Sequence, residues 1–282
     1  MLLPDYLARL GLAHRQGAPP SAAALQQLHR AHVATVAYET VDLVLGRPPA
    51  LDGRASAQRI AAGRGGYCYT LHGAFGWLLE QLGYDVRRHL AGVARAGDEP
   101  MGADGNHLGL TVSGLPAVSC PDGVWLVDVA LGDALREPLP LRWGVYRQGP
   151  FEYRLGPSPL EPGGWRFEQA AGGSFSVADF APGVVGLDAF AEQHRYLSSD
   201  PASPYVRTVT AQRRDATGVD ILRGRVLTRW EGGPPSGREV DEPQWWKLLT
   251  GRFGLRLDAA DRAPLWANVS ARHAEWLAAR AR

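Results

Sequence analysis

The sequence predicts an α+β fold in three parts: a helical first third, a middle part of antiparallel strands, and a smaller α/β part at the end. In the first third, Leu71, Phe75, Leu78 and Leu82 recur at the spacing of a helix. From Asp85 onward the apolar segments are short, alternating or β-branched, and glycine, proline or aspartate separates them, which is typical of antiparallel strands. The composition, 45% hydrophobic and 21% charged over 282 residues, provides a sizeable core.

Helix start and stop signals divide the first third into several helices. Ser21 is a good N-cap for the second of them, and Gly83 is suited to the C-cap of the last. Gly11 and Gly63 end the other two. The helices are expected over residues 3–11, from Ser21 to about Val33, from Ser56 to Ala62, and from Cys68 to Gly83, with a short segment at 41–45 between them.

Strands are expected through the middle part, with Pro121-Asp122-Gly123 as a hairpin turn. After residue 187 the pattern indicates a helix, a strand hairpin, a helix closed by Gly254 and a final helix. The three parts are expected to divide as 1–84, 85–187 and 188–282. Strands are predicted over 86–95, 107–114, 117–131, 145–156, 164–170, 205–214 and 220–232, and helices over 187–199, 243–254 and 263–280.

Charge and cysteine content exclude several classes of protein. The net charge of +1 provides no basic field for nucleic acid or an acidic membrane. The amino terminus lacks the pattern of a signal peptide, and no apolar run approaches the roughly 18 residues of a membrane span. Two cysteines support neither a disulfide framework nor a structural zinc site, so a reducing cytoplasm and no bound metal are expected.

Cys68 is the best candidate for a reactive group. It lies at the start of an amphipathic helix, after Gly65 and Gly66, which permit close backbone approach. A helix N-terminus stabilises an anion, so the thiol is expected to have a lowered pKa. The alternative is a small buried structural cysteine, which is the interpretation for Cys120. Arg64 either stabilises the loop or adds positive potential.

A nucleophilic cysteine needs a base and a group that orients the base. His107 is the candidate base, because it opens a predicted strand beside a glycine-rich turn. Asp128 is the candidate orienter, because a carboxylate in the apolar segment WLVDVAL needs a partner. The alternatives are structural roles for both residues. The order Cys, His, Asp occurs in transglutaminase-like and papain-like thiol enzymes, so it does not select one reaction.

The motif RGGYCY at 64–69 resembles the segment around the acyl-accepting cysteine of the arylamine N-acetyltransferases. The segment VWLVDVALGDALREPLPL at 124–141 resembles the part of that family that carries the triad aspartate. The similarity spans most of the chain in the same order. The further matching segments are 29–48, 195–206 and 251–257.

The resemblance implies a helical bundle, an antiparallel β-barrel and an α/β lid around a cysteine-protease-like core. It also implies transfer of an acetyl group from acetyl-CoA, or another acyl thioester, to an arylamine, hydrazine or N-hydroxyarylamine by a ping-pong reaction. By position, Cys68 is the nucleophile, His107 the base and Asp128 the orienter. No permanently bound cofactor is implied, and the partners are the small-molecule amine and the thioester.

Several positions depart from the family pattern. Thr70 replaces the usual Glu or Gln, and His72 replaces the usual Asn. Tyr38 and Leu131 stand where phenylalanines are common. His72 is interpreted as a hydrogen-bonding residue, with a second proton carrier as the alternative. The residues expected to contact substrate are Tyr38, Tyr67, Thr70, His72, Ala130, Leu131 and Gly132.

These changes spare the triad, so the hypothesis is retained thiol chemistry with altered substrates. One alternative is an amide synthase of natural-product biosynthesis, with an acyl carrier protein as the partner that presents the acyl chain. A second is a thiol hydrolase with the same triad, and a third is a member that only binds ligands. A metal site built from Cys68, His72 and His107 is disfavoured.

Overall fold

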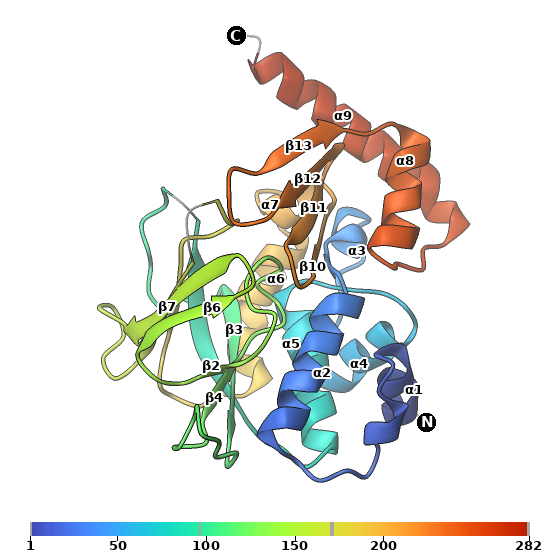
Figure 1. Ribbon diagram of the computed structural model, residues 1–282. Coiled ribbons are helices and arrows are strands. Elements are labelled where there is room, and N and C mark those ends of the chain that lie inside the picture. Colours follow the sequence, from blue (N-terminus) through green and yellow to red (C-terminus); the bar gives the residue numbers. More distant parts are fainter. Residues whose placement is uncertain (1, 96, 170–171, 281–282) are drawn as a thin grey trace.

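The computed structural model describes residues 2–95, 97–169 and 172–280. Helices of the first third pack beside a large sheet, and a second, smaller sheet with its helices lies above both (Figure 1). The α+β prediction is confirmed. The helices of the first third are α1 (Leu2–Arg9), η1 (Ala13–Arg15), α2 (Ala22–Thr35), α3 (Val41–Val44), α4 (Gly53–Ala61) and α5 (Cys68–Gln81).

Capping residues set the ends of these helices. The Ser21 hydroxyl accepts from the backbone N–H of Ala24 at 3.2 Å, which confirms the expected N-cap of α2. Helix α4 begins earlier than expected, because the Asp52 carboxylate accepts from the Ala55 N–H at 2.7 Å and caps it there. Gly83 follows α5 with φ of +85°, a conformation that favours glycine.

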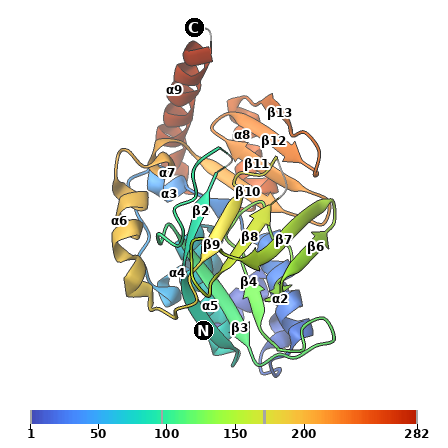
Figure 2. The same cartoon turned by 90° about the vertical axis from the view of Figure 1, so that its left-hand side faces the viewer.

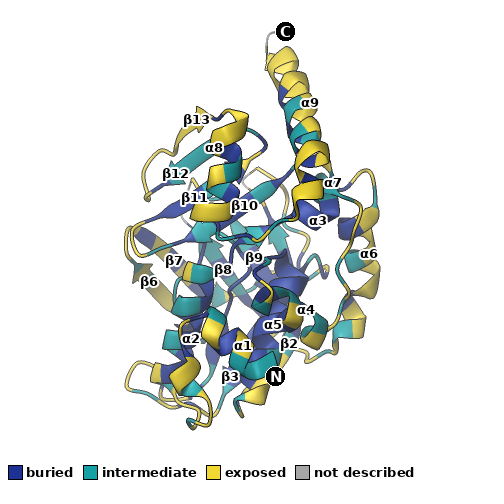
Figure 3. Cartoon of the chain, turned by 90° about the vertical axis from the view of Figure 1, so that its right-hand side faces the viewer, coloured by how far each residue is buried: buried dark blue, intermediate teal, exposed yellow. Residues whose placement is uncertain are grey.

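Helix α5 lies in the centre of the molecule and is almost entirely buried (Figure 3). Its Leu71 and Phe75 belong to the same buried cluster as Leu108, Leu110 and Val127 of the large sheet. Removing this apolar surface from water fixes α5 against strands β3 (His107–Ser113) and β4 (Trp125–Val127). The helix that begins at the predicted nucleophile is therefore packed against the strands that carry the predicted base and orienter.

The large sheet has eight antiparallel strands in the order β5-β4-β3-β2-β9-β8-β7-β6 and curls into a nearly closed barrel (Figure 2). The predicted antiparallel barrel is confirmed. Residue 170, at the end of one predicted strand, lies outside the described residues. The strands are β2 (Asp85–Ala94), β3 (His107–Ser113), β4 (Trp125–Val127), β5 (Leu139–Pro140), β6 (Gly144–Gln148), β7 (Phe151–Pro157), β8 (Trp165–Gln169) and β9 (Val177–Phe180).

The segment 117–131 differs from the expected long strand, because only β4 is extended there. Residues 120–123 form a turn closed by a 3.0 Å bond from the Gly123 N–H to the Cys120 carbonyl. Pro116 and Pro121 lack the N–H that a strand ladder needs, which shortens the strand. Strand β9 was not expected.

The second sheet has five strands in the order β1-β10-β11-β12-β13. Strand β1 comes from the first third of the chain and pairs with β10, with Tyr38 opposite Gln212. The predicted strand over 205–214 begins late, because Ser203 caps the short helix α7, which has proline at its first position. The strands are β1 (Tyr38–Glu39), β10 (Thr210–Arg214), β11 (Val219–Arg223), β12 (Val226–Trp230) and β13 (Ser236–Glu239).

Helices α8 (Glu242–Lys247) and α9 (Arg262–Arg280) pack against this sheet, although most of α9 extends into solvent (Figure 3). Helices η2 (Leu187–Phe190) and α6 (Ala191–Ser199) pack instead against the cluster that contains α5. Gly254, with φ of +64°, follows a π-helical turn that prolongs α8. No helix in the described part of the chain combines the length and apolar character needed to cross a membrane. The helices are η2 (Leu187–Phe190), α6 (Ala191–Ser199), α7 (Pro204–Arg207), α8 (Glu242–Lys247), η3 (Leu248–Arg252), η4 (Ala259–Asp261) and α9 (Arg262–Arg280).

Candidate active site

Cys68 is the first residue of α5 and is buried, with its sulfur 3.8 Å from the carbonyl of Asn106. The loop before it runs beside β1, where the Glu39 N–H donates to the Gly66 carbonyl at 2.9 Å. A side chain at Gly65 would overlap the carbonyl of Ala37. Glycine is therefore required for this close approach, which sets the position of the cysteine.

Cations near this loop are neutralised by acidic partners. Arg59 pairs with Glu39 at 2.8 Å and also bonds Asp42, while Arg64 pairs with Asp42 at 2.9 Å. The Arg59 side chain also donates to the Gly65 carbonyl at 2.7 Å. Of the two roles considered for Arg64, the ion pair with Asp42 fits stabilisation of the loop.

The electrostatic environment of Cys68 differs from the sequence prediction. Burial raises the pKa of the Cys68 thiol to about 12, the backbone N–H of Tyr69 lowers it, and the charge of Asp128 raises it. The predicted lowering is wrong in direction, because desolvation of a buried thiolate outweighs the N-terminus of α5. A thiolate at this position therefore needs a cation formed beside it.

His107 and Asp128 lie on neighbouring strands of the barrel. His107 is the first residue of β3, and Asp128 follows the last residue of β4. The Nε2 of His107 donates to Oδ2 of Asp128 at 2.7 Å, and both residues are buried. Because a carboxylate only accepts, Nε2 carries the proton and Nδ1 keeps its lone pair. His107 and Cys68 line the same cavity.

Asp128 is held by several donors. Its Oδ1 accepts from the backbone N–H groups of Ala130 at 2.8 Å and Leu131 at 2.9 Å. Burial alone would favour the protonated acid, but His72 and His107 outweigh it and hold the pKa of Asp128 well below its usual range. Asp128 is thus a buried carboxylate fixed in orientation.

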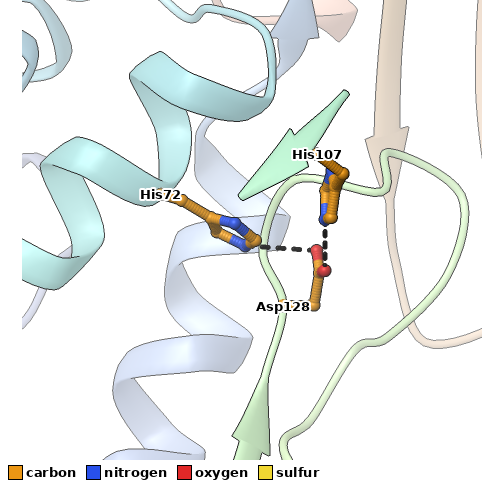
Figure 4. A group of neighbouring side chains, drawn as sticks. All are labelled: His72, His107 and Asp128. Atoms are coloured by element: carbon orange, nitrogen blue, oxygen red, sulfur yellow. Dashed lines mark hydrogen bonds and ion pairs between the residues drawn. The ribbon is translucent and has the colours of Figure 1, made fainter. Parts of the chain in front are cut away.

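His72 reaches the same carboxylate from helix α5, beside the ring of His107 (Figure 4). Its Nε2 lies 3.2 Å from Oδ1 of Asp128 and 3.1 Å from the backbone nitrogen of Val129. Its Nδ1 bonds the carbonyl of Leu108, so Nδ1 carries a proton. The neutral ring then accepts the Val129 N–H at Nε2, whereas the protonated ring donates to Asp128.

The three side chains also offer ligand atoms within 4.8 Å of one another. Their close separations match hydrogen bonds, since the 2.7 Å from His107 to Asp128 leaves no place for an ion between those atoms. We therefore treat His72, His107 and Asp128 as a hydrogen-bonded group.

A cavity of about 370 Å³ opens over Cys68 and His107. Three of the residues expected to contact substrate line this cavity, namely Tyr38, Ala130 and Leu131. Sequence reasoning did not identify the remaining lining residues, which come from distant segments and have no local motif. They include Arg95, Asp98, Tyr205, Thr210, Gln212 and Arg223.

The other expected contact residues lie outside this lining. Tyr67 is buried and bonds His194, and His72 lies 3.2 Å from Asp128. Thr70 is buried, with its hydroxyl unpaired among the described residues. Gly132 has φ of +65°, and a side chain there would overlap Gln212. Their contact with substrate stays a prediction.

Comparison with known proteins agrees with the resemblance of the sequence. A family model described as N-acetyltransferase matches residues 21–262. The arylamine N-acetyltransferase of Mycolicibacterium smegmatis is 39% identical over 98% of both chains. The structure of Mycobacterium marinum arylamine N-acetyltransferase in complex with CoA superposes with a TM-score of 0.79, 26% identity, and coverage of 95% of this chain and 98% of that one.

A third relative has a different activity in its name. Proansamycin X synthase of Amycolatopsis mediterranei is 35% identical over 155 residues, which covers 53% of this chain and 56% of the synthase. The family match and the full-length relative extend over all three parts of the fold. The chain belongs to the arylamine N-acetyltransferase family, and it is an acyltransferase of that family.

Proposed function

We propose that this acetyltransferase works through an acyl-Cys68 intermediate, with acetyl-CoA or a similar acyl-CoA as donor and an arylamine, hydrazine or N-hydroxyarylamine as acceptor. One observation carries the proposal: Cys68 and His107 line one cavity, while His107 donates to the buried Asp128 at 2.7 Å. This is the relation that a nucleophile, a base and an orienter require.

In the first half-reaction, Nδ1 of His107 takes the proton of Cys68 as the sulfur attacks the thioester carbonyl. The imidazolium offsets the charge of the thiolate, and Asp128 stabilises the imidazolium. Backbone N–H groups at the start of α5 are candidate donors to the oxyanion. The tetrahedral intermediate breaks its bond to the sulfur of CoA, which leaves with the proton from His107. The product is a thioester on Cys68.

In the second half-reaction, the amine attacks this thioester. His107 takes the proton from the attacking nitrogen and returns it to the Cys68 sulfur as the carbon–sulfur bond breaks. The amide leaves and the thiol is restored. Asp128 keeps its charge throughout, since its hydrogen bonds favour the ionised form.

His72 is proposed as a positioning residue. It does not line the cavity, but it bonds both the carbonyl of Leu108, next to His107, and the N–H of Val129, next to Asp128. It therefore connects the two strands that carry the base and the orienter. This geometry supports the hydrogen-bonding interpretation rather than direct proton transfer to substrate.

The cavity supports a small donor–acceptor pair. Tyr38, Ala130 and Leu131 provide an aromatic and apolar wall for the ring of an arylamine. A carrier-protein partner has no support from the geometry or the relatives, so acyl-CoA is the proposed donor.

A reducing compartment such as the cytoplasm would keep Cys68 as a thiol; the cysteines are free in the structure.

Steady-state kinetics with acetyl-CoA and an arylamine test this function. Parallel double-reciprocal plots and loss of turnover in Cys68→Ala are expected, while Cys120→Ala, the matched control at the other buried cysteine, should retain turnover. Intersecting plots, or full turnover in Cys68→Ala, would contradict the acyl-enzyme.

An amide synthase is the second candidate, because the chain matches proansamycin X synthase over about half its length. A longer acyl thioester that acylates Cys68 where acetyl-CoA does not would favour it. The hydrolase alternative predicts release of acetate from acetyl-CoA at a rate that added amine does not change.

A further inference from the structure

Two arginines line the cavity that holds Cys68 and His107. Arg95 directly follows β2 of the barrel, and Arg223 ends β11 of the smaller sheet. Arg223 lies opposite Thr210 in the strand register, and Thr210 also lines the cavity. The two guanidinium groups therefore come to one site from two different sheets.

These arginines lack the acidic partners that the arginines beside the Cys68 loop have. Arg59 and Arg64 are paired with Glu39 and Asp42. Within the part of the chain that the structure describes, neither Arg95 nor Arg223 forms an ion pair. Asp98 is the carboxylate in the cavity lining, and it too forms no ion pair with a described residue.

The two cations act on each other and on nearby hydroxyl groups. Arg223 is an exposed residue, yet desolvation and the charge of Arg95 lower its pKa. Burial raises the pKa of Tyr205, and the nearby charge of Arg95 opposes that rise, so Arg95 lies close to a second residue of the cavity wall. Two like charges near each other are unfavourable until an anion lies between them.

We propose that Arg95 and Arg223 form an anion subsite of the catalytic cavity, which binds a carboxylate or phosphate group of a substrate whose reactive end lies at Cys68. Guanidinium groups bind both anions through paired, charge-assisted hydrogen bonds. The subsite deepens the proposed function and rests on it. The anion is supplied either by an amine acceptor that carries a carboxylate or by a phosphate of the thioester donor.

A comparison of kcat/KM between matched substrates, one with and one without the anionic group, distinguishes these two sources. For Arg95→Gln and Arg223→Gln, the ratio of kcat/KM for 4-aminobenzoate to that for the neutral 4-aminobenzamide falls about tenfold if the acceptor supplies the anion. If the donor supplies it, the ratio for acetyl-CoA to S-acetyl-N-acetylcysteamine, which lacks phosphate, falls about tenfold in the first half-reaction. Either fall supports the subsite.

A second readout needs no acyl transfer. The Cys68 thiolate displaces iodide from iodoacetate or from iodoacetamide, and forms one carbon–sulfur bond in each case. These reagents have similar size and differ in charge, so the ratio of their rates reports a local anion site. The ratio is expected to fall about tenfold in both arginine variants.

Arg54→Gln is the matched control. It removes the same charge, but Arg54 is exposed on α4 and lies outside the cavity lining. Unchanged ratios in all three variants, for substrates and alkylating agents alike, would overturn the subsite. If wild-type protein transfers acetyl to no amine while the alkylation ratio still depends on Arg95 and Arg223, the proposed function fails and the subsite stands.

Discussion

The Nε2 of His72 lies 3.2 Å from Oδ1 of Asp128, while the Nε2 of His107 donates to Oδ2 of the same carboxylate at 2.7 Å. Two imidazoles therefore lie against one buried carboxylate, His72 beside Oδ1 and His107 at Oδ2 (Figure 4). In its neutral form, His72 connects the backbone beside each of the other two residues, because its Nδ1 donates to the Leu108 carbonyl and its Nε2 accepts from the Val129 N–H.

Replacement of His72 tests this positioning role. His72→Ala leaves the Val129 N–H and the Leu108 carbonyl without their partner, so kcat/KM should fall about 10- to 100-fold, the equivalent of about 1–3 kcal/mol. His72→Asn can donate and accept, and should stay within about threefold of wild type. The rate of Cys68 alkylation by iodoacetamide should fall with kcat in His72→Ala. Equal losses in both variants would contradict the hydrogen-bonding role.

Replacement of Asp128 tests the orientation of the base. Asp128→Asn keeps the shape of the side chain. Its amide can present an N–H donor to His107, where the carboxylate can only accept the His107 proton. The ring then loses its fixed tautomer, and kcat should fall on the order of 10³- to 10⁴-fold. Stopped-flow acetylation measures the loss. A fall of less than tenfold would show that His107 needs no orienter.

Asp133 predicts a pH dependence of stability outside the triad. Burial raises the pKa of Asp133 from 3.8 to about 6, although the Ser174 N–H and hydroxyl donate to it. Its stabilising contribution is thus present below pH 3.8 and is lost as the pH rises through about 6. Asp133→Asn removes this titration.

The free energy of unfolding of Asp133→Asn, minus that of wild type, should therefore grow by about 2.4 kcal/mol between pH 4 and pH 7, because one pKa unit corresponds to about 1.4 kcal/mol. Urea unfolding at several pH values measures this difference. A difference that stays constant over that range would rule out a raised pKa for Asp133.

Gly132 and Gly46 form a matched pair for a packing prediction. Both have positive φ, +65° and +68°, but a side chain at Gly132 would overlap Gln212, whereas Gly46 has open space. Both alanine variants should carry backbone strain, and Gly132→Ala should lose up to about 1 kcal/mol more, because the end of the Gln212 side chain must move aside. Thermal unfolding measures the pair. Equal losses would mean that Gln212 moves away freely.

The sequence predicted the α+β class and the antiparallel barrel because helical and strand periodicities separate cleanly near Asp85. It also led to Cys68, His107 and Asp128 as candidates, since helix starts and isolated polar residues in apolar segments are local signals. The pKa of Cys68 was predicted in the wrong direction, because burial is a property of the whole fold and outweighs the helix terminus.

The cavity wall could not be predicted from local pattern. Tyr38 reaches it through a two-residue strand that pairs with β10, more than 170 residues later in the chain. Arg95 and Arg223 come together only when the two sheets pack. Pairings over such separations have no signature in the neighbouring sequence, so the substrate side of the site required the structure.

The most direct test of the central claim is mass spectrometry of the protein mixed with acetyl-CoA alone, followed by peptide mapping. The account predicts one acetyl group per chain, on the peptide that contains Cys68, and its disappearance when an arylamine is added, with formation of an equal amount of amide. Amide formation by a protein that never carries acetyl on Cys68 would show direct transfer from donor to acceptor, and would contradict the account.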